Sequence, residues 1–316
     1  MAMMQDILDG LRDRGLIGAF APISRMEDLM RDVEELKNGD FHTDHIDWIV
    51  NNADKSIPDD PGFEPRSLLT AVAFSPKMSL RFTLDGNLVD CILPPTYAEF
   101  GTAESKESDY VVELLKRHGY GAKENRYIPQ KMLAVHCGLG RYGRNNIFYS
   151  DVFGSYAKIY TFITDMPCGD APWHPLRRME SCDSCGACVA ACPTNAIDEN
   201  RRIVNADICI TAFNERDRDF PDWLDKGAHN ALVGCVKCQD CCPRNAGNID
   251  KIVRGAEFTE AETRALLAHK KGEPLPDGLS EKLESNGIWK SFIQLIPRNL
   301  SALLGDGDRQ YLKTEI

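Results

Sequence analysis

The chain has 316 residues, 43% of them hydrophobic, and a formal net charge of −11. This length predicts two or three domains, and the composition predicts a globular protein with a sizeable core. The acidic balance argues against broad electrostatic binding to nucleic acid, which depends on Lys and Arg displacing counterions. The sequence has neither an apolar run near the roughly 18 residues that span a bilayer nor a basic leader, so we expect a cytosolic protein with no membrane partner.

The first part of the chain predicts helices alternating with strands. Apolar residues at helical spacing predict a helix over residues 5–14, and a buried strand over residues 15–21 follows it. Ser24 and Glu27 have the spacing of a capping box, which predicts the start of the next helix. This alternation of helices and strands is typical of an α/β domain.

The following segment adds a hairpin and two more helices. Residues 67–74 predict a buried strand, and alternating apolar residues on both sides of Asp85 and Gly86 predict a β-hairpin. An amphipathic helix is predicted over residues 106–118. A further helix is predicted to end at Gly138, because glycine accepts the left-handed conformation after a helix.

A glycine-rich stretch, Gly138-Leu-Gly140-Arg-Tyr-Gly143, matches the dinucleotide-binding fingerprint G-x-G-x-x-G. That fingerprint requires a strand before it and a helix after it. Here a helix precedes it, and strand-like segments at residues 147–149 and 159–164 follow it. A dinucleotide site is therefore the weaker alternative. We interpret the stretch as a loop whose glycines let the backbone approach a bulky ligand.

A proline-rich link at residues 170–175 separates this material from a cysteine-rich segment. Beyond that segment, Thr259 and Glu262 have the spacing of a second capping box, and the apolar stripe that follows predicts helices. The three expected domains are residues 1–168, 169–250 and 251–316.

The cysteines carry the most specific signal. Eight of the twelve lie in two complementary runs, and the first has the C-x2-C-x2-C-x3-C-P spacing of bacterial ferredoxins. In such runs the fourth cysteine ligates the other cluster, so each run completes the cluster of its partner. This crossover assigns cluster 1 to Cys182, Cys185, Cys188 and Cys242, and cluster 2 to Cys192, Cys209, Cys235 and Cys238. Cys241 is then the spare thiol of the second run.

Other uses of the cysteines are weaker interpretations. Zinc sites usually show two separated C-x2-C pairs without the proline that ends each run here. A disulfide framework is unexpected in a large chain without a secretory signal. Cys91 lies inside a predicted strand and is expected in the core. Cys137 and Cys168 flank the glycine loop, where each is either a small buried residue or a redox-active thiol.

The segment from Leu133 to Asn245 resembles the epoxyqueuosine reductase and reductive dehalogenase superfamily. The resemblance rests on the glycine loop, Gly154-Ser155, Thr164-Asp-Met-Pro167 and both cysteine runs. It implies an α/β (α+β) fold: a flavin-reductase-like corrinoid-binding domain, a two-cluster bacterial-ferredoxin-like domain and a helical C-terminal tail. The implied cofactors are two [4Fe–4S] clusters and cobalamin.

The resemblance also implies where the corrinoid and its acid would lie. The residues expected to bind the corrinoid are Gly138, Gly140, Arg141, Tyr142, Gly143, Asn145, Ser155 and Asp165. In epoxyqueuosine reductases an aspartate shortly before the glycine loop donates a proton, and the matching position here is Glu124. Glutamate keeps the acid but lengthens the arm, which is a departure from the family. Tyr142 is the second expected catalytic residue.

The leading hypothesis is a reductase that takes electrons from a reduced ferredoxin- or flavodoxin-type donor. The electrons would pass through the two clusters to a corrinoid that reduces a substrate. The acidic charge and the departure at Glu124 favour a small-molecule substrate over tRNA. One alternative is epoxyqueuosine reduction on tRNA. Another is a non-catalytic electron carrier or corrinoid-handling protein, although a ferredoxin alone needs only ~80 residues.

Overall fold

The computed structural model describes residues 2–39, 41–97, 106–201, 203–270 and 272–304. The chain forms two compact units, and neither is continuous in sequence. The first unit holds the N-terminal region, residues 106–186 and residues 197–207. The second holds the predicted hairpin, residues 187–196 and the described chain from Ile208 onward.

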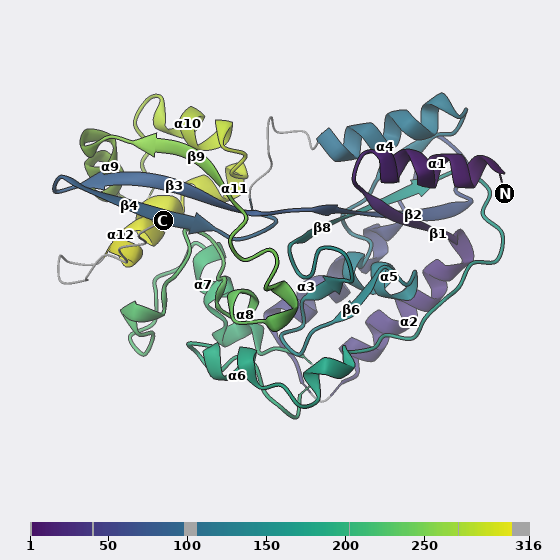
Figure 1. The fold of residues 1–316 in the computed structure, drawn as a ribbon, viewed down its shortest axis with the longest axis horizontal. Helices are drawn as coiled ribbons and strands as arrows, with labels where there is room; N and C mark the ends of the chain where they lie inside the picture. The colour runs from purple at the N-terminus through teal and green to yellow at the C-terminus, as the bar shows by residue number, and fades with distance from the viewer. Residues whose placement is uncertain (1, 40, 98–105, 202, 271, 305–316) are drawn as a thin grey trace. The chain divides into compact units, whose positions relative to one another are not determined.

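The first unit is a sheet covered by helices on both sides (Figure 1). Its helices are α1 (Ala2–Asp13), α2 (Met26–Lys37), α3 (Asp44–Asn52), α4 (Lys106–Arg117) and α5 (Gln130–His136). Its strands are β1 (Ile17–Pro22), β2 (Ser67–Phe74), β5 (Ala122–Glu124), β6 (Gly140–Tyr142), β7 (Phe148–Ser150) and β8 (Ala157–Thr164). Four of them form an antiparallel sheet in the order β1-β2-β8-β5, while β6 and β7 pair with each other.

The two faces of this sheet have different coverings, because successive residues of a strand point to opposite sides. Leu69 and Phe162 pack with α1 and α4 on one side, which we call the α4 face. Leu68 and Ile163 pack with α2 and α5 on the other side, the α5 face. The strand register therefore decides on which face each site residue lies.

The second unit contains a smaller sheet covered by C-terminal helices. Its strands are β3 (Lys77–Leu84), β4 (Asn87–Leu93) and β9 (Ile252–Phe258), in the order β4-β3-β9. Its helices are α6 (Ala187–Ala191), α7 (Ile210–Glu215), α8 (Lys237–Asp240), α9 (Glu260–Leu267), α10 (Leu279–Ser285), α11 (Lys290–Ile293) and α12 (Ile296–Leu304). The predicted hairpin forms, and its turn places Asp85 and Gly86 at φ 51° and 74°, as a primed turn requires.

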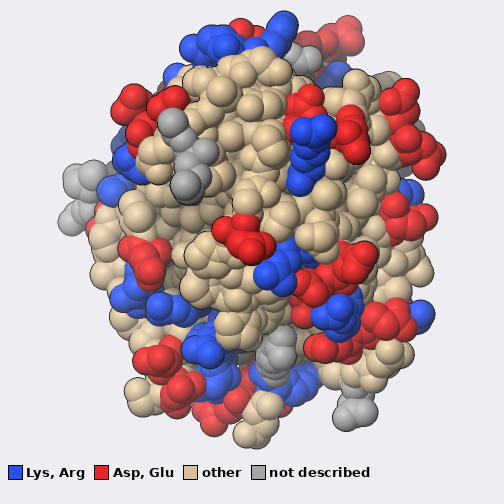
Figure 2. Space-filling view, turned by 90° about the vertical axis from the view of Figure 1, so that its right-hand side faces the viewer, with Lys and Arg blue, Asp and Glu red and all other residues tan. Residues whose placement is uncertain are grey.

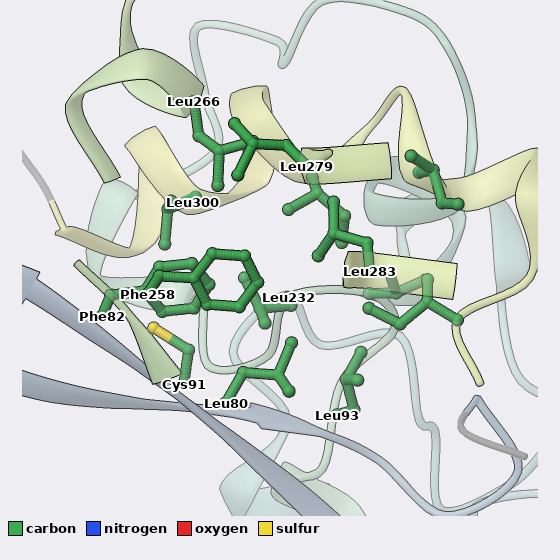
Figure 3. Packing of buried hydrophobic residues seen from close by; sticks show 14 of the residues in the cluster. Leu80, Phe82, Cys91, Leu93, Leu232, Phe258, Leu266, Leu279, Leu283 and Leu300 are labelled. Carbon is green, nitrogen blue, oxygen red and sulfur yellow. The ribbon is translucent and has the colours of Figure 1, made fainter. Parts of the chain in front are cut away.

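The core of the second unit lies between this sheet and helices α9 to α12 (Figure 3). The Phe82 and Phe258 rings stack with their centroids 4.6 Å apart. Cys91 is buried in this cluster, as the sequence predicted, and burial raises the pKa of its thiol to about 12. Cys91 is therefore a core residue.

Two features of the fold differ from the expected domains. The β3–β4 hairpin was expected in the first domain but belongs to the second unit. The C-terminal tail was expected to be helical, yet β9 pairs in parallel with β3, about 170 residues earlier in the sequence. Long-range pairing of this kind leaves no local pattern, because the partner strand is specified by packing rather than by spacing.

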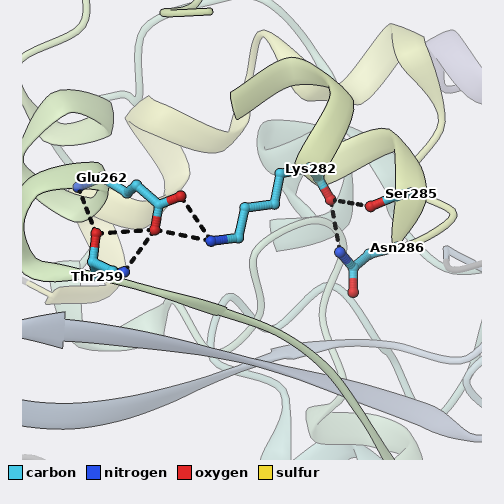
Figure 4. Close-up of polar contacts among 5 residues, drawn as sticks. All are labelled: Thr259, Glu262, Lys282, Ser285 and Asn286. Carbon is cyan, nitrogen blue, oxygen red and sulfur yellow. Dashed lines mark hydrogen bonds and ion pairs between the residues drawn. The ribbon is translucent and has the colours of Figure 1, made fainter. Parts of the chain in front are cut away.

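The two predicted capping boxes have different outcomes. Ser24 lies in a 3-10 turn (Ile23–Arg25), and α2 then begins without a side-chain cap, so that capping box does not form. At α9 the box is complete (Figure 4): the Glu262 amide donates to the Thr259 hydroxyl at 3.3 Å, and the Glu262 carboxylate accepts from the Thr259 amide at 2.8 Å. Lys282 donates to both Glu262 oxygens at 2.7 and 2.8 Å. Burial raises the pKa of Glu262, but the bonds from Lys282 and Thr259 outweigh it and hold this pKa below its ordinary value.

Thr259→Ala should lower the free energy of unfolding by about 1 kcal/mol, because an amide of the first turn of α9 loses its acceptor. Chemical denaturation measures the change. Ser301→Ala, at an exposed position in α12, is the matched control and should change stability by less than about 0.5 kcal/mol. Equal effects of the two substitutions would show that the capping box contributes nothing.

Candidate iron–sulfur centre and glycine loop

The four cysteines assigned to cluster 2 all belong to the second unit. Burial is the largest cause that raises the pKa of Cys209, to about 11; bonds from Thr211 oppose it, and the neighbouring thiols of Cys235 and Cys192 add to it. Cys238 lies on α8, which packs against α6. The thiols of Cys192 and Cys235, which belong to two other segments, therefore lie near enough to Cys209 to affect its charge.

Amide groups donate to two of these sulfurs. The Asn230 side chain donates to Cys235 Sγ at 3.2 Å, and the backbone amide of Ala196 donates to Cys192 Sγ at 3.2 Å. Hydrogen bonds to cysteine sulfur stabilise the thiolate and adjust the reduction potential of a bound cluster. This chemistry of the sulfur donors fits an iron–sulfur cluster.

The cysteines assigned to cluster 1 are divided between the units. Cys182 and Cys185 lie in a turn of the first unit, where the Cys185 amide donates to the Cys182 carbonyl at 3.3 Å. Cys188 and Cys242 belong to the second unit. Within the described residues, no group of three or more His, Cys, Asp or Glu side chains is placed to hold a single metal ion. The four-cysteine assignments of both clusters stay predictions from spacing.

The glycine loop is bonded to the segment that leads into the first cysteine run. The Tyr142 amide donates to the Arg177 carbonyl at 3.0 Å, and the Met179 amide donates to the Tyr142 carbonyl at 2.8 Å. Arg144 donates to the Cys182 carbonyl. Backbone and side-chain bonds therefore hold Tyr142 beside the start of the cluster segment.

Packing inside the chain accounts for the three glycines of this loop. A Cβ atom on Gly140 would lie 2.2 Å from the Tyr149 carbonyl oxygen, and one on Gly143 would lie 2.5 Å from the Asn145 side chain. Gly138 has φ 77°, and a Cβ there would lie 2.9 Å from the His174 ring. The space that a side chain would need is filled by protein atoms, so these glycines do not outline an open cradle.

The other expected corrinoid ligands lie in different surroundings. The Asn145 side chain is buried and donates to the Tyr149 hydroxyl at 2.9 Å. Ser155 is buried just before β8, whereas Asp165 follows the end of β8 and accepts from the Gly121 amide. Ten residues of extended chain separate Ser155 from Asp165 by roughly 25 Å or more. Arg141 is exposed and Tyr142 is half-buried.

The two expected catalytic residues lie on opposite faces of the sheet. Glu124 pairs with Phe162 of β8 and points to the α4 face, where the Ser108 hydroxyl of α4 donates to its carboxylate at 2.6 Å. Arg126 donates to the other carboxylate oxygen at 3.4 Å. Tyr142 packs with Val72 on the α5 face. The structure therefore does not bring Glu124 and Tyr142 together.

Lys131 is a residue beside Tyr142 that sequence reasoning missed. It lies on α5, its Nζ donates to the Asn146 carbonyl at 3.0 Å, and this nitrogen is 6.0 Å from the centre of the Tyr142 ring. Burial lowers the pKa of Lys131 to about 8. A lysine in a helix is usually solvated, so only its position about two turns before the loop could have drawn attention to it.

Residues 181–245 match the family model described as "4Fe-4S double cluster binding domain". This match covers both cysteine runs and confirms the prediction that they form a double-cluster domain. The zinc and disulfide interpretations are correspondingly set aside.

Several known proteins similar to the chain are epoxyqueuosine reductases. Epoxyqueuosine reductase of Staphylococcus aureus is 31% identical over 144 residues, which are 46% of this chain and 35% of that protein. The Bacillus subtilis enzyme of the same name is 32% identical over 120 residues, 38% of this chain and 30% of that protein. Over these matched residues the chain is similar to the epoxyqueuosine reductases. The matched region spans about a third of the length of these relatives.

The fold is similar over almost the whole chain. A crystal structure of epoxyqueuosine reductase with an epoxyqueuosine-modified tRNA-Tyr stem loop covers 96% of this chain and 81% of its own, with a TM-score of 0.63 and 19% identity. The selenomethionine-labelled enzyme has the same coverage and a TM-score of 0.64. These structures and the double-cluster match support the coarse prediction of a mixed α/β fold that contains a 4Fe-4S double-cluster domain.

These comparisons confirm the predicted resemblance, and they support the prediction of an oxidoreductase because the relatives are reductases by name. They contradict the preference for an unidentified small-molecule substrate over tRNA, because the relatives are named for epoxyqueuosine and one was solved with a tRNA stem loop. The error has a physical reason: net charge averages over the whole chain, whereas a nucleic acid is bound by local groups. None of the described helices is long and apolar enough to cross a membrane.

Proposed function

We propose that the chain is an iron–sulfur oxidoreductase that reduces epoxyqueuosine in tRNA. The observation that carries this proposal is the double-cluster segment at residues 181–245, in a chain that is about 30% identical to several epoxyqueuosine reductases over 120 to 144 residues. The proposed electron source is a reduced ferredoxin- or flavodoxin-type protein. Reductive removal of an epoxide oxygen as water consumes a pair of electrons and a pair of protons, so the site needs both a redox centre and an acid.

The geometry favours the α5 face as the place of reduction. Electrons leave the cluster segment, and Tyr142 is bonded through Arg177 and Met179 to the residues that lead directly into it. Glu124 lies across the sheet, with its carboxylate engaged by Ser108 and Arg126. Tyr142 is therefore the proposed proton donor. Lys131, with a pKa of about 8, is the proposed group that supplies the tyrosine with a proton.

Cobalamin is implied by the superfamily resemblance and is proposed on that ground alone. The glycines pack against protein atoms, and the sheet keeps Ser155 and Asp165 apart, so the expected ligands do not form a cradle for a macrocycle. We derive no catalytic step through a corrinoid for this reason. Titration of the cluster-containing protein with cobalamin, followed by its visible spectrum, tests the assignment. Unchanged spectra at saturating cobalamin would rule out the cobalamin assignment.

On an acidic protein, tRNA binding must depend on a small number of local contacts. Acidic and basic side chains are interspersed on the face of the molecule drawn in Figure 2. A few phosphate contacts on such a surface give affinity that falls as salt rises, with a shallower slope than that of a strongly basic protein. We expect affinity for an epoxyqueuosine-modified stem loop to fall between low and moderate salt by this mechanism.

The proposed activity is tested with chemically reduced, anaerobically purified protein and an epoxyqueuosine-modified tRNA stem loop. Mass spectrometry of the digested RNA should show loss of one oxygen from the modified nucleoside. The Cys238→Ser variant is the matched control and should leave the nucleoside intact. If protein with both clusters reduced leaves the nucleoside unchanged, the proposed function is wrong and the electron-carrier alternative takes its place.

A further inference from the structure

Arg144 is a buried cation without a carboxylate partner. Its side chain is only 8% exposed, and its guanidinium donates to two backbone carbonyls, those of Cys182 and, at 2.8 Å, Glu199. Its Nε is buried and has no hydrogen-bond partner. Among the described residues, no Asp or Glu carboxylate forms an ion pair with Arg144. All these contacts lie within the first unit.

A buried charge of this kind is costly unless an opposite charge compensates it. Backbone carbonyls supply only dipoles. One of these carbonyls belongs to Cys182, the first cysteine of the ferredoxin-type run. A cluster held by four thiolates carries net negative charge in its oxidised state, and reduction adds more. A cluster bound through Cys182 would therefore provide the missing counter-charge.

We propose that Arg144 is the counter-charge and positioning residue of the cluster that Cys182 ligates. The guanidinium fixes the cysteine turn through the Cys182 carbonyl and leaves its Nε–H group unpaired. This role depends on the cluster domain and not on the tRNA substrate, so it can be tested independently of the proposed activity.

The charge has a definite consequence for redox chemistry. A fixed positive charge stabilises the reduced cluster more than the oxidised one, because the reduced cluster is more negative. Arg144 should therefore raise the reduction potential of this cluster relative to the same site without the cation. The cluster held by the cysteines of the second unit should be much less affected, because Arg144 donates to the Cys182 and Glu199 carbonyls and not to any of those cysteines.

The test uses Arg144→Gln, Arg144→Lys and, as the matched control, Arg141→Gln at an exposed arginine of the same loop. Iron and sulfide analysis gives cluster content, and an EPR-monitored redox titration gives both potentials. Arg144→Gln should shift one potential to more negative values and leave the other unchanged. The shifted signal should be the one that is lost in Cys185→Ser. Arg144→Lys should restore much of the shift, and Arg141→Gln should match the wild-type protein.

Two outcomes would overturn the inference. One is an Arg144→Gln protein with full iron content and both potentials unchanged. The other applies if Arg144→Gln fails to retain the cluster, because iron content is then the readout. The inference then requires Arg144→Lys to retain clearly more iron than Arg144→Gln. Equal iron loss in both would show that charge is not what the site requires.

Discussion

Replacing Cys238 with serine should remove one of the two clusters and lower the iron content from about eight to about four atoms per chain. Cys238 lies on α8, in the same unit as Cys192, Cys209 and Cys235. Serine is a poor ligand for iron compared with a thiolate, so this cluster should lose a bond that its neighbours cannot replace. Metal analysis and EPR of the anaerobic protein measure the loss.

Cys241 offers a matched control three residues away. The ferredoxin crossover leaves Cys241 outside both ligand sets and places Cys242 in cluster 1. Cys241→Ser should therefore keep both EPR signals, whereas Cys242→Ser should lose the signal that Cys185→Ser also loses. A Cys241 variant that loses iron as completely as the Cys242 variant would refute the crossover. Zinc in place of iron in the purified protein would refute the cluster assignment itself.

The second large effect is expected at Tyr142. Tyr142→Phe removes the phenolic proton but keeps the ring that packs with Val72 on the α5 face. Loss of a general acid usually slows turnover by about 10²- to 10⁴-fold. We expect a fall of this size in kcat for reduction of epoxyqueuosine in the stem loop, with iron content and both reduction potentials unchanged. Single-turnover kinetics with pre-reduced protein measure the chemical step.

Glu124→Gln is the matched comparison, because it removes the other candidate acid. Glu124 lies on the α4 face with Ser108 and Arg126 as partners, so the glutamine variant should keep the turnover rate within a few-fold of wild type. A collapse of activity in Glu124→Gln together with an active Tyr142→Phe would reverse this assignment. Stability should change little, since a partly exposed pair such as Glu124 and Arg126 contributes about 0 to 1 kcal/mol.

Lys131 should affect how the reaction rate depends on pH. Burial lowers the pKa of Lys131 to about 8, so the side chain is protonated below that pH and neutral above it. If the protonated form supplies Tyr142, the rate should fall as pH rises through about 8. Lys131→Met should be slower at neutral pH and should lack this alkaline limb. An identical alkaline limb in both proteins would assign the titration to another group.

Local patterns in the sequence were enough for several parts of this protein. The cysteine spacing specifies the double-cluster domain because the ligands of one turn must lie at fixed intervals. The hairpin follows from Asp85 and Gly86, since few residues accept positive φ. Cys91 was placed in the core by the alternation of its strand. Each of these features depends on residues that are neighbours in the chain.

Other features were decided only by the tertiary structure. Antiparallel register put Glu124 opposite Phe162 and so on the α4 face, while Tyr142 packs on the α5 face; one residue of slip would reverse the face of Glu124. The crowding around Gly140 comes from Tyr149 on the paired strand. The burial of Lys131 and the missing ion-pair partner of Arg144 likewise depend on segments distant in sequence. Chemistry of this kind is specified by the solvation and charge around a side chain, which are known only when the packing is known.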